Sequence, residues 1–209
     1  AGSSGSGKST IADLILGLIN PTKGVIQIDD QLLGRENLLS WQEMLSYVPQ
    51  NTFILEGSIK ENITFGSNDE TEDSKNLLND AIDKAGLREF IESLPKGVET
   101  EVGEKGYMIS GGQKQRIGIA RAFYNKSKFI IFDEATNAQD NITEAEILKS
   151  IFDHKDKFTF LIIAHRLSTL ENCDNILFLK NGEISDSGNF NQLKETSKEF
   201  KAMLETKKQ

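Results

Sequence analysis

The chain has 209 residues, of which 37% are hydrophobic and 27% charged, a globular balance that argues against global disorder. Its formal net charge of −8 argues against a surface devoted to nucleic acid or anionic lipid. The single cysteine, Cys173, excludes an internal disulfide, and no apolar run approaches the roughly 20 residues that cross a bilayer. These facts predict an acidic cytosolic domain.

The beginning of the chain predicts a fragment. Ala1 is not an initiator methionine, and a glycine-rich motif begins at once at Gly2. A phosphate-binding loop of this kind normally follows a buried strand, for which no residues are present. We therefore expect a longer polypeptide that supplies this strand.

The first elements mix helix and strand. Apolar residues on one helical face predict a helix over residues 11–19. A short strand is expected at residues 25–28. The capping-box pattern at residues 40–43 predicts the start of a second helix, and a strand is expected at residues 47–48.

The middle of the chain is helical in character. Ser58 and Glu61 repeat the capping-box pattern, and an amphipathic stripe over residues 77–85 ends at Gly86. We expect a helical subdomain over residues 58–125.

Strand character returns after this insertion. Residues 129–132 and 158–163 are short, continuously apolar runs, which are typical of strands buried on both faces of a parallel sheet. A strand at 176–179, a turn at Asn181 and a helix over 190–204 follow. The pattern predicts one α/β domain over residues 1–209, with a core of about 1–57 and 126–209 around the helical insertion.

The opening segment matches the phosphate-loop pattern G-x-x-x-x-G-K-[ST] at every position. Glycines let successive backbone N–H groups surround phosphate oxygens. Lys8 can reach the β- and γ-phosphates, and the Ser9 hydroxyl can ligate Mg²⁺. A Gly/Ser linker is the alternative, but a helical pattern follows directly. The residues predicted to bind nucleotide here are Gly2, Ser3, Ser4, Gly5, Ser6, Gly7, Lys8, Ser9 and Thr10.

A second motif delivers two carboxylates at the end of a strand. The apolar residues 129–132 precede Asp133 and Glu134, and ligands of parallel sheets bind beyond such strand ends. Asp133 is expected to support the Mg²⁺ shell through water, and Glu134 to act as general base toward the attacking water. An apolar strand ending in acids is common by itself, but together with a phosphate loop it indicates a nucleoside triphosphatase.

A third motif opens another helix. A small polar residue and two glycines precede Gln113 and an apolar helical pattern, an arrangement that can cradle an anion. Alone it would be a cap on a surface helix, but the continuation into Lys-Gln-Arg favours function. The nucleotide-binding residues expected here are Ser110, Gly111, Gly112 and Gln113.

These three segments resemble the Walker A, Walker B and signature motifs of the ABC ATPase family. Gln50 lies in a segment that resembles the Q-loop, Asp140 in one that resembles the D-loop, and His165 in one that resembles the H-loop. The resemblance implies a RecA-like P-loop NTPase core that uses ATP and Mg²⁺. It also implies that Gln50 is a catalytic residue and metal ligand, that Asp140 belongs to the nucleotide site, and that the catalytic His165 contacts the γ-phosphate.

Two further segments resemble exporter-type cassettes. Residues 100–106 resemble the X-loop, and residues 57–63 resemble the segment after the Q-loop. The resemblance implies contact with a transmembrane domain upstream in the same polypeptide and a location at the cytoplasmic face of the inner membrane. It implies no nucleic-acid partner, and membrane contact only through the transmembrane domain. It also places the adenine-stacking aromatic residue before the phosphate loop, in the missing part.

The same resemblance implies ATP-driven dimerisation, most simply of two identical cassettes. Each nucleotide would lie between the phosphate loop of one cassette and the signature helix of the other. Three residues depart from the family pattern: Ile109 stands where leucine is usual, and Asn137 and Gln139 replace serine and leucine around the D-loop.

Other functions stay open at this point. A non-transport ABC ATPase in DNA repair, chromosome organisation or ribosome function is one alternative. The chromosome type would place a long coiled coil between Gln50 and Ser110, where no sustained heptads occur. A regulatory module that holds ATP without turnover is another. The sequence does not choose among lipid-linked sugar, lipid, peptide and drug as substrate, or between homodimer and heterodimer.

Overall fold

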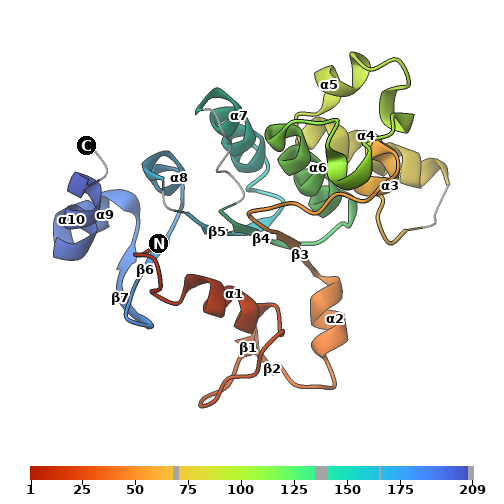
Figure 1. Cartoon of the computed structure of the whole chain (residues 1–209). Coiled ribbons are helices and arrows are strands. Elements are labelled where there is room, and N and C mark those ends of the chain that lie inside the picture. The colour runs from red at the N-terminus through yellow and green to blue at the C-terminus, as the bar shows by residue number, and fades with distance from the viewer. Residues whose placement is uncertain (68–70, 135–140, 165, 207–209) are drawn as a thin grey trace. The chain divides into compact units, whose positions relative to one another are not determined.

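The computed structural model describes residues 1–67, 71–134, 141–164 and 166–206. Contacts divide the chain into a first unit, Ala1–Glu36 with Ile163–Gln209, and a second unit, Asn37–Ile162. Figure 1 labels the helices and strands of both units. The expected α/β class with a parallel sheet is confirmed.

The first unit contains the phosphate-loop segment and the C-terminal elements. The antiparallel pair β6–β7 has a turn at Asn181 and Gly182, as expected. Backbone bonds join the start of the chain to β6: the Ala1 amino group donates to Leu177 O and Leu179 N–H donates to Ala1 O, both at 2.8 Å. Its elements are α1 (Lys8–Ile15), β1 (Gln27–Ile28), β2 (Gln31–Leu32), α8 (Leu167–Glu171), β6 (Ile176–Lys180), β7 (Glu183–Gly188), α9 (Phe190–Thr196) and α10 (Lys198–Thr206).

The second unit holds a sheet in the order β3-β4-β5 within the described residues. β3 runs parallel to β4, with Tyr47 opposite Ile131. Its strands are β3 (Leu45–Val48), β4 (Phe129–Asp133) and β5 (Thr159–Ile163), the last residue of which is counted with the first unit. Its helices are α2 (Leu38–Glu43), α3 (Ile59–Ile63), α4 (Glu72–Lys84), α5 (Arg88–Glu92), η1 (Gly97–Glu99), η2 (Glu104–Gly106), α6 (Gly111–Tyr124) and α7 (Asn141–Phe152).

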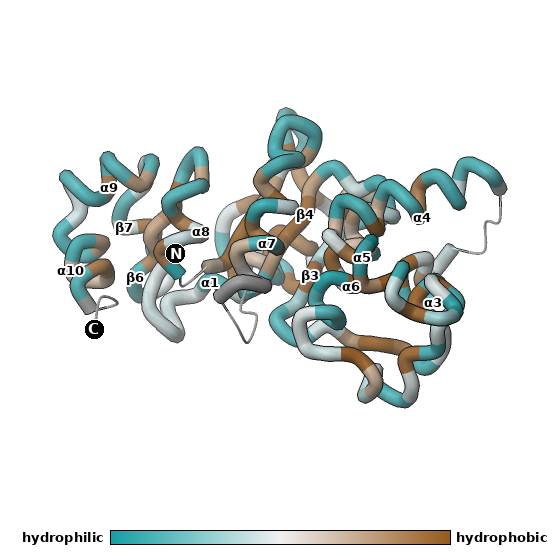
Figure 2. The backbone as a smooth tube through the Cα atoms, turned by 90° about the horizontal axis from the view of Figure 1, so that it is seen from above, coloured by the Kyte–Doolittle hydropathy of each residue, from teal (hydrophilic) through white to brown (hydrophobic). Residues whose placement is uncertain are grey.

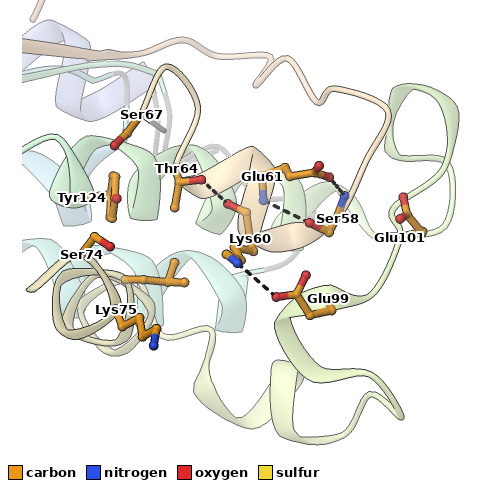
Figure 3. A pocket seen from close by; sticks show the side chains of 11 residues that line it. Ser58, Lys60, Glu61, Thr64, Ser67, Ser74, Lys75, Glu99, Glu101 and Tyr124 are labelled. Carbon is orange, nitrogen blue, oxygen red and sulfur yellow. Dashed lines mark hydrogen bonds and ion pairs between the residues drawn. The ribbon is translucent and has the colours of Figure 1, made fainter. Parts of the chain in front are cut away.

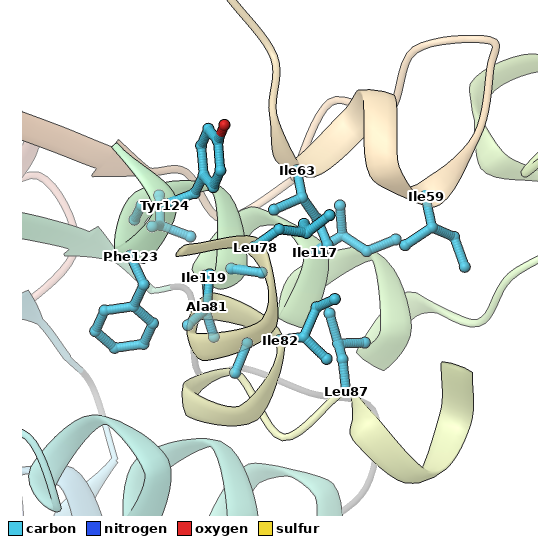
Figure 4. Packing of buried hydrophobic residues seen from close by; sticks show 14 of the residues in the cluster. Ile59, Ile63, Leu78, Ala81, Ile82, Leu87, Ile117, Ile119, Phe123 and Tyr124 are labelled. Carbon is cyan, nitrogen blue, oxygen red and sulfur yellow. The ribbon is translucent and has the colours of Figure 1, made fainter. Parts of the chain in front are cut away.

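The core of the second unit forms where α3 and α4 pack against α6 (Figure 4). The predicted stripe of α4 supplies Leu78, Ala81 and Ile82, which face Ile117 of α6 and are all buried. Strand β4 is buried along its middle and is hydrophobic in Figure 2. This packing fixes α6 relative to the helices around it, and therefore fixes the position of its N-terminus within the second unit.

The capping predictions had mixed outcomes. The box at Ser58 is confirmed: Ser58 Oγ accepts from Glu61 N–H, and Ser58 N–H donates to Glu61 Oε2 (Figure 3). The prediction that residues 40–43 open a helix is wrong, because α2 already begins at Leu38 after Asn37. The early start places Ser40 inside the helix.

Two helices end earlier than the apolar pattern predicts. α1 ends at Ile15 because Gly17, with φ 67°, takes the left-handed conformation that terminates helices. Leu18, the next residue of the expected stripe, is 64% exposed. The expected helix over 190–204 is broken at Ser197, which has extended backbone and whose Oγ accepts from Phe200 N–H at the start of α10.

The compact units divide the chain differently from the expected core and helical subdomain, because β3, β4 and β5 share their unit with the helices. The boundaries at 58 and 125 therefore stay a proposal. None of the described helices is long and apolar enough to span a bilayer.

Candidate functional site

The phosphate loop has the backbone that its glycines predict. Gly2, Gly5 and Gly7 have φ values of 149°, 75° and 100°, which residues with a Cβ rarely adopt. A Cβ at Gly2 would also lie 2.4 Å from the Leu179 carbonyl oxygen, in the neighbouring strand β6. Both constraints explain why the loop must begin with glycine.

Lys8 and the β6–β7 turn hold this loop together within the first unit. Lys8 Nζ donates to Gly2 O at 3.2 Å and to Ser3 O at 2.8 Å. Gly182 N–H donates to Ser6 O at 3.1 Å. Ser9 is exposed at the first turn of α1. The ammonium group and a helix N-terminus thus accompany the loop, an arrangement suited to phosphate.

The two predicted carboxylates each receive a hydrogen bond from the β3 segment. Gln50 Nε2 donates to Glu134 Oε2 at 3.1 Å, and Tyr47 Oη donates to Asp133 Oδ2 at 3.1 Å. The first contact unites two residues that the sequence predicts to be catalytic. Glu134 also has φ 51°, a left-handed backbone conformation that is uncommon outside glycine and frequent at functional sites.

The segment after Gln50 is tied to α6. Gln115 Nε2 donates to Pro49 O at 3.3 Å, and Thr52 Oγ1 donates to Gln115 Oε1 at 3.2 Å. The approach is close, because a Cβ at Gly118 of α6 would lie 2.6 Å from Thr52 Oγ1. The loop that carries Gln50 is therefore held by the same helix that begins at the signature motif.

Arg121 of α6 extends this link. Its Nε donates to Asn62 O at 2.8 Å, its Nη1 donates to Phe53 O at 3.2 Å, and its guanidinium lies over the Phe65 ring, 5.5 Å from the centroid. Asn62 is fully buried and donates in turn to Leu55 O at 3.0 Å. Burial lowers the pKa of Arg121. The guanidinium is held by backbone carbonyls and by an aromatic face.

We expect Arg121→Met to lower the free energy of unfolding by about 1–3 kcal/mol, because the carbonyl of the fully buried Asn62 loses its donor. Urea denaturation checks this value. Lys75→Met is the control: Lys75 pairs with Glu72 at 3.5 Å on the surface, where such a pair contributes about 0–1 kcal/mol. Equal losses for the two variants would contradict the structural role of Arg121.

The signature segment forms the capped start of α6. Ser110 Oγ accepts from Gln113 N–H at 3.2 Å, and Ser110 N–H donates to Gln113 Oε1 at 2.8 Å. Gln113 thus stabilises the start of α6, and Ser110 and Gly111 are exposed at that end of the helix.

The two segments that resemble exporter cassettes pair with each other. Ile59 N–H donates to Thr100 O at 3.0 Å, and Val102 N–H donates to Gly57 O at 2.9 Å. A polar pocket of about 530 Å³ lies beside them (Figure 3). Its lining, within the described part of the chain, includes Lys60 and Tyr124 but no residue of the predicted nucleotide or metal set.

The structure brings together some of the predicted site residues and leaves others in separate units or outside the described residues. Gln50 and Glu134 contact each other, while Ser9 belongs to the first unit and Asp133 to the second. Asp140 and His165 lie outside the described residues. Sequence reasoning missed three residues that contact the Gln50 loop or Asp133, because their partners are remote in the chain. They are Tyr47, Gln115 and Arg121.

Residues 1–137 match the ABC transporter family model. The chain is 42% identical to a multidrug resistance ABC transporter ATP-binding and permease protein of Lactococcus lactis over 193 residues, which are 92% of this chain and 32% of that protein. It is also 42% identical to an ATP-dependent lipid A-core flippase of Saccharophagus degradans over 196 residues, 94% of this chain and 33% of that protein. The chain therefore spans about a third of the length of these relatives.

A solved structure of a bacterial Atm1-family ABC exporter with ATP bound is similar over 99% of this chain and 36% of its own, with a TM-score of 0.89 and 36% identity. The family match implies that the chain binds ATP. The order of the motifs, the exporter relatives and this structural similarity all indicate the same family. The chain belongs to the ABC transporter family, as an ATP-binding domain of the exporter type.

Proposed function

We propose that the chain is the ATP-hydrolysing motor of an exporter that moves its substrate across, or flips it within, a membrane. The observation that carries the proposal is the hydrogen bond from Gln50 to Glu134. It joins the candidate general base, at the end of a buried strand, to the loop held by α6. The permease and flippase names of the relatives support transport as the use of this ATPase.

The roles of the residues follow from their chemistry. Glu134 accepts a proton from the attacking water, a step that typically contributes about 10²–10⁴-fold to a rate. Lys8 and the N–H groups of the phosphate loop stabilise negative charge on the phosphates. His165 would contact the γ-phosphate. Gln50 orients Glu134 and links the nucleotide state to the membrane part.

The donor atoms of this chain fit Mg²⁺. The Ser9 hydroxyl and the Gln50 amide oxygen are hard oxygen ligands of the kind that this ion prefers. The ion also keeps several waters, and the Asp133 carboxylate would accept a hydrogen bond from one of them. The described residues include no group of three His, Cys, Asp or Glu side chains suited to a metal. Phosphate and water oxygens commonly supply the remaining ligands of Mg²⁺ and would do so here. When bound, Mg²⁺ would neutralise charge on the β- and γ-phosphates.

A second copy of the cassette would complete each site. Ser110 and Gly111 are exposed at the start of α6, where a helix N-terminus favours an anion. They would contact ATP held by the partner's phosphate loop, and Asp140 would lie at the same interface. The transmembrane domain, in the same full-length chain, would hold this assembly at the cytoplasmic face of the membrane.

Phosphate release by the full-length protein in liposomes, with Mg²⁺ or with EDTA, tests the proposal. We expect hydrolysis that needs Mg²⁺ and drives movement of a lipid or drug probe from a panel. Binding of ATP without hydrolysis would favour the regulatory module instead. Hydrolysis by a full-length protein that lacks membrane-spanning segments would favour a non-transport ABC ATPase.

A further inference from the structure

Tyr47 contacts one of the two Walker B carboxylates. It stands on β3 opposite Ile131 of the parallel strand β4, so Asp133, two residues further along β4, is its diagonal neighbour on the same face. The Tyr47 Oη donates to Asp133 Oδ2 at 3.1 Å. The register of the sheet therefore sets this contact.

The contact constrains the carboxylate in a specific way. A hydrogen bond to an ionised acceptor is stronger than a neutral one and fixes its direction. With Oδ2 held by the phenol, the rotation of the Asp133 carboxylate is restricted, and its Oδ1 can accept a hydrogen bond from a water of a metal shell. Glu134 is held in a similar way, because Gln50 Nε2 donates to its Oε2 at 3.1 Å. Each carboxylate at the end of β4 thus has its own positioning donor from the β3 side.

We propose that Tyr47 is a positioning residue for Asp133, and that its hydroxyl sets how strongly Mg²⁺ tightens nucleotide binding. The inference rests on the proposed function, because it assumes that Asp133 supports the Mg²⁺ shell. Partners that orient groups around a metal typically change its affinity by about 10–100-fold when they are removed. Tyr47 is 41% exposed, so its effect belongs at the lower end of this range.

The test is Tyr47→Phe in the full-length protein, which removes one oxygen and keeps the ring. The dissociation constant of the non-hydrolysable analogue AMP-PNP is measured by calorimetry with Mg²⁺ and with EDTA. We expect binding with Mg²⁺ to weaken about tenfold and binding with EDTA to stay unchanged. Tyr124→Phe is the matched control, because Tyr124 lies in the helical core and its hydroxyl loss should leave both constants unchanged.

A second background tests whether Tyr47 acts through Asp133. In Asp133→Ala the phenol has lost its acceptor. Adding Tyr47→Phe to that variant should therefore not change the ratio of the AMP-PNP dissociation constant with EDTA to that with Mg²⁺. An unchanged ratio in Tyr47→Phe alone, or equal weakening with and without Mg²⁺, would overturn the inference while leaving the proposed function intact. Absence of any Mg²⁺ effect in the wild type would overturn both.

Discussion

Replacing Glu134 with glutamine in the full-length protein is expected to lower the rate of ATP hydrolysis by about 10²–10⁴-fold while nucleotide binding stays close to that of the wild type. The amide keeps the shape of the side chain and loses the basic oxygen. Gln50 Nε2, which donates to Glu134 at 3.1 Å, can donate to the new amide oxygen instead. Neither residue is branched at Cβ, so the backbone at φ 51° is equally accessible to both.

Steady-state phosphate release measures the rate, and calorimetry with ATP measures binding by this slow variant. Glu43→Gln is a suitable control, because Glu43 is an exposed glutamate at the end of α2 in the same unit. We expect its rate to equal that of the wild type. Hydrolysis by Glu134→Gln within threefold of the wild type would remove Glu134 from the role of general base.

Mixed dimers that carry Lys8→Ala on one subunit and Gly111→Asp on the other are expected to trap about one ATP, whereas either mutant homodimer traps almost none. Lys8→Ala removes the ammonium group that lies at the phosphate loop. Gly111→Asp puts an anion at the exposed start of α6. If each site uses the signature of the partner, both defects fall in one site and the other site is intact.

Glu134→Gln is added to both subunits, so that trapped ATP is counted without hydrolysis. Counting trapped ATP gives the same answer whether rapid turnover needs one intact site or two. The mirror arrangement is the sharpest control: with Lys8→Ala and Gly111→Asp on the same subunit, a mixed dimer with an otherwise unaltered partner has no intact site under the composite model. If each cassette used its own signature, that dimer would keep one intact site.

The two arrangements therefore exchange their outcomes between the models. One trapped ATP in the first dimer and none in the second supports sites shared between cassettes. None in the first and one in the second would reject them. A Glu134→Gln dimer without further changes must trap ATP well, which establishes that trapping reports assembled sites.

The sequence by itself determined the motifs whose geometry is local. The phosphate loop needs glycines at positions of positive φ, and Gly2, Gly5 and Gly7 adopt such values. The capping box predicted at Ser58 is present, because donor and acceptor stand three residues apart and meet whenever the helix begins there. Local spacing is sufficient for such features, and the order of the motifs also identified the family.

Local pattern was insufficient where a distant residue or a neighbouring turn competed with it. The expected C-terminal helix breaks because Ser197 Oγ caps α10 and also donates to Asp186, eleven residues earlier in the chain, at 2.9 Å. The box at Ser40 fails because α2 starts at Leu38.

Only the tertiary structure decided which groups surround the carboxylates and the Gln50 loop. Tyr47 meets Asp133 through the register of two parallel strands, and Arg121 meets Phe53 through the packing of α3 and α4 on α6. These partners are 86 and 68 residues apart, so no short spacing in the sequence encodes them. Hydrophobic packing chooses the register and the helix contacts, and the polar pairs follow from that choice.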